Sequence, residues 1–249
     1  MGDLPWPLLL AAGLAVLAGY TVYGLTGFGA NIVAMPLLVL VFPLRFAVPL
    51  MLVFDLVAGL LLGLRNHRRA DWREMRRLIP WLLVGMLAGV TLLARAPEHW
   101  LLLLLGVFVS GFALWSLVRH ALHDPVSPRW AAPAGLIGGA FTAMYGTGGP
   151  IYTMFLARRL ADKTRLRATI GVLVLGTAAT RGLLLAGGGF YAQPGLLAAT
   201  LALLPCALAG FALGSLLHRR LPVARAMQAV WLLLVVAGSG LVWRSLSQI

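Results

Sequence analysis

Two stretches of small and polar residues interrupt an otherwise apolar sequence, and both are suited to bind an anion. Residues 23–31 read Y-G-L-T-G-F-G-A-N, and residues 140–155 read A-F-T-A-M-Y-G-T-G-G-P-I-Y-T-M-F. The clustered glycines and the proline predict that one helix ends and another begins within each stretch. The first turn of a helix presents unpaired N–H groups and the positive end of the helix dipole, which attract anions. We therefore interpret the two breaks as facing halves of one anion site.

The candidate substrate-binding residues lie at these two breaks. Glycines free the backbone there, and threonine, asparagine and tyrosine side chains add hydrogen-bond donors. We expect the new helices to begin near Ala30 or Asn31 and at Pro150. The alternative is that the glycines serve only close packing between helices. The candidates are Thr26, Gly27, Phe28, Gly29 and Asn31 in the first break, and Tyr145, Gly146, Thr147, Gly148 and Gly149 in the second, with Tyr152 as a further donor.

Asp55 and Arg181 are the only acid and base expected within spanning helices. A charge inside the membrane is costly and is a functional candidate by default. For Arg181 we predict substrate binding, because a guanidinium group holds an oxyanion through two parallel hydrogen bonds. For Asp55 we predict a protonatable coupling residue. The alternative for both is a structural ion pair between them.

Composition assigns the chain to the membrane. Of its 249 residues 61% are hydrophobic and 11% charged, with a mean hydropathy of +0.92, whereas soluble domains average about 45–50% apolar and about 25% charged residues. The net charge of +13 lies mostly in short segments between apolar runs, which is typical of cytoplasmic loops and argues against a nucleic-acid partner. The single cysteine, Cys206, and the scattered histidines show no metal-binding spacing, so we expect neither a metal nor another cofactor.

Six apolar runs are long enough to span a bilayer, and two further regions, 4–42 and 131–157, contain the breaks. Basic segments at 65–77, 119–129, 158–167 and 218–225 are assigned to the cytoplasm, which places both termini in the periplasm. Each broken region then enters and leaves on one side, as a re-entrant pair of half-helices or a tight helical hairpin. The six runs cover residues 46–64, 78–94, 99–118, 168–186, 195–217 and 222–243.

A repeat supports this topology. The pattern Pro-x4-Gly-x3-Gly-x7-Pro occurs at residues 80–97 and again at 205–222, an offset of 125, and the Thr-Gly pair at 26–27 recurs at 147–148. We therefore predict an all-α polytopic membrane protein, one transmembrane domain over 1–249, with repeats at about 4–118 and 131–246. Each repeat has a broken hairpin and three transmembrane helices, and this odd number makes the second copy inverted. The Gly-x3-Gly pairs also have a purely structural interpretation as close helix contacts.

The two glycine-rich segments resemble the two halves of the sulfite exporter TauE/SafE family. They read G-L-T-G-F-G-A-N-I-V-A-M-P-L-L and G-L-I-G-G-A-F-T-A-M-Y-G-T-G-G-P-I, about 120 residues apart, and the resemblance covers essentially the whole chain. It implies a bacterial inner-membrane permease for small anions such as sulfite, sulfoacetate or related organic acids. The family signature falls here on Gly24, Thr26, Gly27, Gly29, Asn31 and Pro36, and on Gly138, Gly139, Gly146, Gly148, Gly149 and Pro150.

We accordingly expect a secondary transporter of a small anion, with protons as the candidate coupling ion, working as a monomer or a homo-oligomer. One rival is an intramembrane enzyme acting on a lipid phosphate. Such chemistry usually requires a carboxylate, histidine or serine as base or nucleophile. The membrane region offers one carboxylate and no histidine, so we assign no catalytic residue. The other rival is a passive anion channel.

Overall fold

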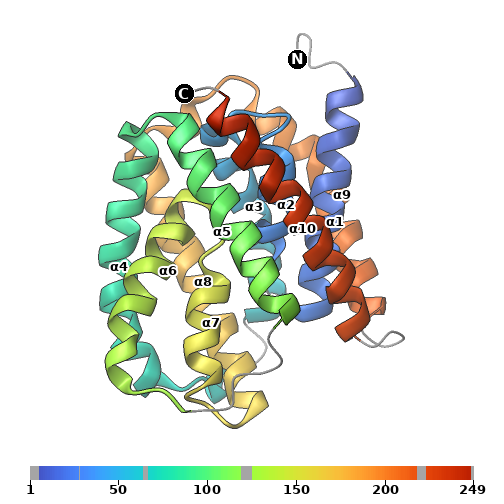
Figure 1. Cartoon of the computed structure of the whole chain (residues 1–249). Coiled ribbons are helices and arrows are strands. Elements are labelled where there is room, and N and C mark those ends of the chain that lie inside the picture. The colour runs from blue at the N-terminus through green and yellow to red at the C-terminus, as the bar shows by residue number, and fades with distance from the viewer. Residues whose placement is uncertain (1–5, 28, 64–66, 119–124, 218–222, 248–249) are drawn as a thin grey trace. The chain divides into compact units, whose positions relative to one another are not determined.

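The computed structural model describes residues 6–27, 29–63, 67–118, 125–217 and 223–247, and every element in this described part is a helix (Figure 1). Parts of three basic segments, at 65–66, 119–124 and 218–222, lie outside it. The long helices are α1 (Trp6–Thr26), α3 (Leu44–Gly63), α4 (Trp72–Arg95), α5 (Glu98–Val118), α8 (Lys163–Gly187), α9 (Leu196–Leu217) and α10 (Val223–Leu246). The shorter helices are α2 (Ala30–Leu38), α6 (Ala131–Tyr145) and α7 (Gly149–Ala157), with 3-10 turns η1 (His67–Arg69), η2 (Pro128–Trp130) and η3 (Phe190–Ala192).

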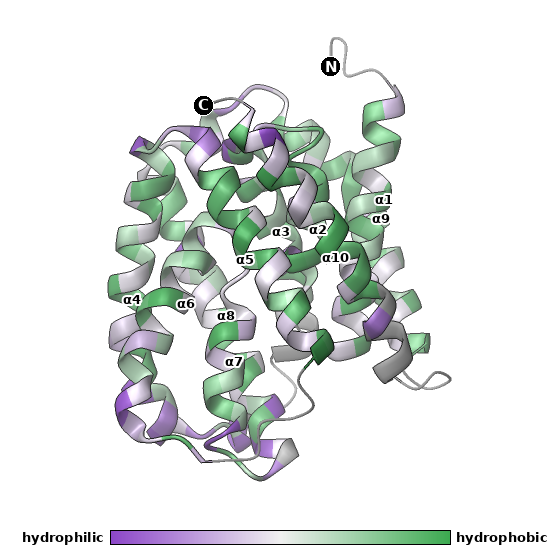
Figure 2. Cartoon of the chain, in the orientation of Figure 1, coloured by the Kyte–Doolittle hydropathy of each residue, from purple (hydrophilic) through white to green (hydrophobic). Residues whose placement is uncertain are grey.

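The long helices follow the predicted apolar runs. Within the described residues, five helices are long and apolar enough to cross a membrane, namely α1, α4, α5, α8 and α9. The other two runs form α3, with 20 residues, and α10, with 24. Green, hydrophobic residues cover most of these helices in Figure 2. The prediction of an all-α polytopic membrane protein is therefore confirmed.

The two broken regions differ in length. At 1.5 Å per residue, the 15 residues of α6 extend about 22 Å and the nine of α7 about 14 Å, both less than the roughly 30 Å hydrocarbon core. In the first region, α1 has 21 residues, enough for a full crossing of about 31 Å, while α2 has nine. The second region is thus a pair of half-helices, and the first joins a full-length helix to a short one. Helix α2 begins at Ala30, as predicted. Helix α7 begins at Gly149, one residue before the predicted Pro150.

The helices group into two compact units, and each unit combines helices from both halves of the sequence. Unit 1 consists of Met1–Ala47, Arg95–Ala121 and Gln193–Ile249, which hold α1, α2, α5, α9 and α10. Unit 2 consists of Val48–Ala94 and Leu122–Ala192, which hold most of α3 together with α4, α6, α7 and α8. Each unit therefore contains one of the two breaks.

In unit 1, glycines let helices approach closely. Helix α1 lies along α9, where Gly210 and Gly214 press against the backbone carbonyls of Leu17 and Thr21. Helix α5 lies along α10, and Gly106 faces the carbonyl of Gly238. A Cβ atom at these glycines would collide with backbone. Small residues are the usual means of close helix contact in lipid, where no hydrophobic effect drives helices together.

Glycines also allow close helix contacts in unit 2, which has a hydrophobic core as well. Gly85 and Gly89 of α4 press against the backbone of Leu136 and Ala140 in α6. Gly210 and Gly214 are the matches of these two glycines at an offset of 125. Both pairs therefore make the same kind of helix contact, each pair within its own unit. The close-packing interpretation of the Gly-x3-Gly pairs is confirmed. The core is formed by Met75, Leu78 and Leu82 of α4, Tyr152, Phe155 and Leu156 of α7, and Ile170 and Leu173 of α8.

We predict that Gly210→Ala destabilises the protein and Gly111→Ala does not. The first adds a Cβ against the Leu17 carbonyl, and overpacking of this kind costs about 1–3 kcal/mol. The second adds a Cβ at a glycine of α5 with nothing within 4 Å. Thermal unfolding in detergent, followed by tryptophan fluorescence, measures both. Equal midpoints for the two variants would contradict the packing account.

Candidate functional site

The second break is built around a backbone turn that only glycines fit. Helix α6 ends at Tyr145, and Gly146 has a φ of 72° in the left-handed region. The Gly146 N–H donates to the carbonyl of Thr142 at 2.9 Å. Gly148 then passes so close to the Gly138 carbonyl and the Thr142 hydroxyl that no side chain fits there. Helix α7 starts at the next residue, so its N-terminus lies inside the protein.

Arg181 of α8 lies beside this break and is almost fully buried, with 2% of its surface exposed. Its Nη2 donates to Asp55 Oδ2 of α3 at 2.8 Å, and its Nη1 donates to the Thr142 carbonyl at 3.2 Å. The same carbonyl accepts the Gly146 N–H. Arg181 is thus attached to the last turn of α6. Its Nε has no hydrogen-bond partner in the part of the chain that the structure describes.

Several polar side chains surround the pair. Tyr152 of α7 interacts with the Thr177 side chain of α8 and lies within electrostatic range of both Asp55 and Arg181. Thr147, in the break itself, is 1% exposed, and its hydroxyl oxygen is another buried atom without a partner among the described residues. Tyr145 is fully buried, with its ring 5.6 Å from that of Phe141. Two buried donors, Arg181 Nε and the Thr147 hydroxyl, therefore have no hydrogen-bond partner among the described residues.

Asp55 and Arg181 form the ion pair that the sequence analysis gave as the structural alternative to their functional roles. Both groups are buried, and a buried pair must offset the cost of removing two charges from water. Because Asp55 already neutralises Arg181, an anion that binds here has to use the free Nε and compete with Asp55 for Nη2. The ion pair and a binding role for Arg181 are therefore compatible.

The first break, in unit 1, has a similar backbone, but none of the described arginines of unit 1 is buried. Gly27 and Gly29 have φ values of 83° and 89°, and α2 begins directly afterwards with Asn31 buried as its second residue. The Thr26 hydroxyl donates to the Val22 carbonyl at 2.8 Å, so its hydrogen is used within α1. Phe28 lies outside the described residues.

Within unit 2 the structure brings together most of the predicted site. The sequence did not identify Thr142, whose carbonyl joins Arg181 to the break, or Thr177, which contacts Tyr152. Thr142 is four residues before Gly146, a spacing that marks a carbonyl near a helix end, but no pattern shows that α8 approaches it. A single site shared by both breaks stays a prediction. Unit 2 holds Asp55, Tyr145, Gly146, Thr147, Gly148, Gly149 and Arg181, and unit 1 holds Thr26, Gly27, Gly29 and Asn31.

A second ion-pair cluster fixes the two ends of the broken region in unit 2. Buried Glu74 accepts from Arg77 at 2.7 Å and from Arg159 at 2.9 Å, and this hydrogen bond raises the pKa of Arg159. Arg159 also donates to the Val126 carbonyl at 3.1 Å. The exit from α7 and the approach to α6 therefore lie together, in agreement with a region that enters and leaves on one side.

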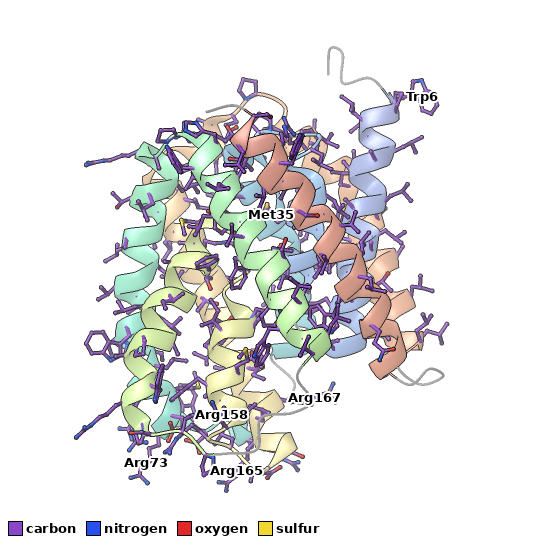
Figure 3. All side chains as sticks on the ribbon, in the orientation of Figure 1. Trp6, Met35, Arg73, Arg158, Arg165 and Arg167 are labelled. Carbon is purple, nitrogen blue, oxygen red and sulfur yellow. The ribbon has the colours of Figure 1, made fainter. Side chains whose placement is uncertain are left out.

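The same end of unit 2 is rich in basic residues. Figure 3 labels three of them there, Arg73, Arg158 and Arg165, and hydrophilic residues gather at this end in Figure 2. They lie at the start of α4, the end of α7 and the start of α8. The basic segments of the sequence thus mark one end of this unit.

We predict that Asp55→Asn destabilises the protein more than Arg181→Gln. Loss of Asp55 leaves a guanidinium group that cannot lose its proton, and breaking a buried pair in this way costs about 3–5 kcal/mol. Loss of Arg181 leaves a carboxylate that can take a proton and become neutral. Denaturant unfolding in bicelles measures both variants and the double variant, which we expect to be more stable than Asp55→Asn. Equal losses in the single variants would contradict this electrostatic account.

Comparison with known proteins agrees with the glycine-rich signature. The family described as "Sulfite exporter TauE/SafE" matches residues 11–241. The chain is 31% identical over 201 residues to the "Probable inner membrane transporter protein TsaS" of Comamonas testosteroni, covering 78% of this chain and 83% of that protein. No solved structure gives a match. Since the family match spans nearly the whole chain, this protein belongs to the sulfite exporter TauE/SafE family of membrane transporters.

Proposed function

We propose that this protein is a secondary transporter that binds a small anion at the break between α6 and α7, beside Arg181. The observation that carries the proposal is the attachment of a buried arginine to the carbonyl of Thr142, in the last turn of α6. A charged residue inside the membrane is expensive and marks a substrate or ion pathway by default. Family membership supports transport as the purpose of that site.

The chemistry of the break suits an oxyanion such as sulfite, an organosulfonate or a carboxylate. The N-terminus of α7 supplies the positive end of a helix dipole, and a guanidinium group matches two oxygens of a planar or tetrahedral oxyanion. Arg181 Nε and the Thr147 hydroxyl, both buried and without partners among the described residues, are the donors that such a ligand would use. Sulfite is also the anion that the family description names.

The break in unit 1 is the second half of the proposed anion site, contributed by the first copy of an inverted repeat. The matched contacts of Gly85 and Gly89 with α6, and of Gly210 and Gly214 with α1, support two repeats at about 4–118 and 131–246. Alternating access then follows from movement of one repeat against the other, with the substrate held between them.

The proposed function includes an orientation in the membrane and a coupling ion. The basic end of unit 2 faces the cytoplasm by the positive-inside rule, which places both termini in the periplasm of a bacterial inner membrane. The relative from Comamonas testosteroni carries "inner membrane" in its name. Asp55 is the proposed coupling residue and the proton the coupling ion, because this carboxylate contacts Arg181 directly.

The test is uptake of labelled sulfite, methanesulfonate, sulfate and acetate into proteoliposomes, with and without a pH gradient. Arg181→Gln removes two charge-assisted hydrogen bonds, so we expect uptake to fall at least about 100-fold. Arg73→Ala, which removes an exposed arginine, is the matched control and keeps wild-type uptake. Preloading the vesicles with the same anion accelerates a carrier but not a channel.

Two results would overturn the proposal in different ways. Wild-type flux in Arg181→Gln would remove Arg181 as a substrate ligand. Failure of every anion to enter vesicles that contain folded wild-type protein would refute anion transport itself.

A further inference from the structure

We infer that a cavity at the basic end of unit 2 binds a phosphate group, as a second anion site that goes beyond the proposed function. The cavity has a volume of about 570 Å³ and shares no residue with the break between α6 and α7. One wall comes from η1 and the start of α4, and the other from the start of α8. Its charged and polar lining residues are Arg68, Arg69, Asp71, Asp162, Thr164 and Arg165.

The guanidinium groups of the three lining arginines have no partner among the described residues. Arg68, Arg69 and Arg165 are exposed, and no described side chain or carbonyl accepts a hydrogen bond from their guanidinium groups or forms an ion pair with them. Other arginines of this unit are already paired, as Arg159 is with Glu74. An unpaired guanidinium group presents parallel N–H groups that match two oxygens of a phosphate. The cavity therefore offers three such groups to a ligand.

The two aspartates of the lining bind backbone groups rather than these arginines. Asp71 accepts from two N–H groups in the first turn of α4, at 3.1 and 3.0 Å, and Asp162 accepts from two in the first turn of α8, at 2.7 and 3.4 Å. Each aspartate therefore caps its helix and occupies N–H groups to which an anion would otherwise bind. The groups available to an anion are thus the arginine side chains, which outnumber the carboxylates in the lining.

A buried hydroxyl group joins the two walls of the cavity. Thr169 of α8, which is fully buried, accepts from the Asp71 N–H at 2.9 Å and donates to the Arg165 carbonyl at 2.7 Å. The guanidinium groups take no part in this contact. The backbone of both walls is therefore fixed without a ligand, and binding requires only the exposed arginine side chains to move.

The cavity lies at the membrane end of spanning helices, which favours a phospholipid headgroup as the source of the phosphate. Trp72, which also lines the cavity, is 54% exposed and begins α4, and both α4 and α8 are long and apolar enough to cross a membrane. Exposed tryptophans of spanning helices lie at the level of the headgroups, and basic pockets between such helices bind anionic headgroups. The volume is also within the usual range of about 300–1,000 Å³ for small-ligand sites. A soluble phosphate offers the same chemical group.

Four probes separate a lipid headgroup from a soluble phosphate. Purified protein in an uncharged detergent is titrated with dioctanoyl phosphatidylglycerol, dioctanoyl phosphatidylcholine, glycerol 3-phosphate or inorganic phosphate, and thermal unfolding gives an apparent Kd for each. The two lipids share acyl chains and a phosphodiester, but only phosphatidylglycerol carries a net negative charge. We expect saturable stabilisation by phosphatidylglycerol, with a Kd at least about tenfold lower than that of phosphatidylcholine.

Two neighbouring arginines of α8 give a matched pair of variants. Arg165 lines the cavity, whereas Arg167, which is also exposed, does not; Figure 3 labels both. Because a charge-assisted hydrogen bond is lost, Arg165→Ala should weaken phosphatidylglycerol binding at least about tenfold, and Arg167→Ala should change it less than about twofold. Arg165→Lys keeps the charge without the parallel donors and should be intermediate. If Arg165→Ala does not fold, Arg68→Ala, in the opposite wall, replaces it.

A further variant separates this cavity from the break. Arg165 and Arg181 are 16 residues apart on α8, which corresponds to about 24 Å along the helix. Arg181→Gln should therefore keep the wild-type Kd for phosphatidylglycerol while it loses anion uptake. Failure of the cavity to bind phosphate and failure of the break to bind a transported anion are thus measured separately.

Each result supports or overturns the second site. Selective weakening in Arg165→Ala assigns the cavity to a lipid headgroup if phosphatidylglycerol binds most tightly, and to a soluble phosphate if glycerol 3-phosphate or inorganic phosphate does. Absence of saturable binding by every probe, equal Kd values for the two lipids, or equal effects of Arg165→Ala and Arg167→Ala would overturn it. Loss of phosphate binding in Arg181→Gln would also overturn it, because the ligand would then bind at the break.

Discussion

The buried guanidinium group of Arg181 is the constraint on which the rest of unit 2 depends. Arginine keeps its charge in proteins, so an apolar helix that carries one must meet acceptors from other elements. Here they are Asp55 of α3 and the carbonyl of Thr142 in α6. The second acceptor lies in the last turn of α6, which ends at Tyr145 and carries the negative end of the helix dipole, and it also accepts the Gly146 N–H. The last turn of α6, which leads into the break, thus supplies the carbonyl that holds the arginine.

Glycine packing positions that break. Close contact of α4 with α6 through Gly85 and Gly89 fixes the helix that ends beside Arg181, and the ion pairs of Glu74 fix the far ends of the hairpin. In unit 1, Gly210 and Gly214 give α1 the same support before its own break. Neither arrangement needs charged residues within the membrane, which leaves Asp55 and Arg181 as exceptions that call for a functional explanation.

The sequence predicted the elements well and the contacts between them poorly. Apolar runs of about 20 residues predict helices because backbone groups in lipid must form their hydrogen bonds within the same segment. Clustered glycines with Pro150 predict a break because they change the backbone at that point in the chain. The pairing of Asp55 with Arg181, 126 residues apart, remained one of two interpretations because it depends on which faces of α3 and α8 meet. No sequence pattern indicated that Glu74 is buried or that the Thr142 carbonyl accepts from Arg181. Charged residues between apolar runs are usually exposed, and the backbone of a threonine in an apolar helix usually bonds only within that helix. The one-residue difference at the start of α7 reflects Gly149 joining the helix ahead of the proline.

The most direct test of the central claim is an anomalous diffraction measurement on crystals soaked with bromomethanesulfonate, a monoanion whose bromine reports its position. This account predicts a bromine peak at the break between α6 and α7, with the sulfonate oxygens on Nε and Nη2 of Arg181 and the Asp55 carboxylate moved off Nη2. A sulfonate bound elsewhere, at a concentration that saturates transport and with the Asp55–Arg181 bond intact, would contradict it.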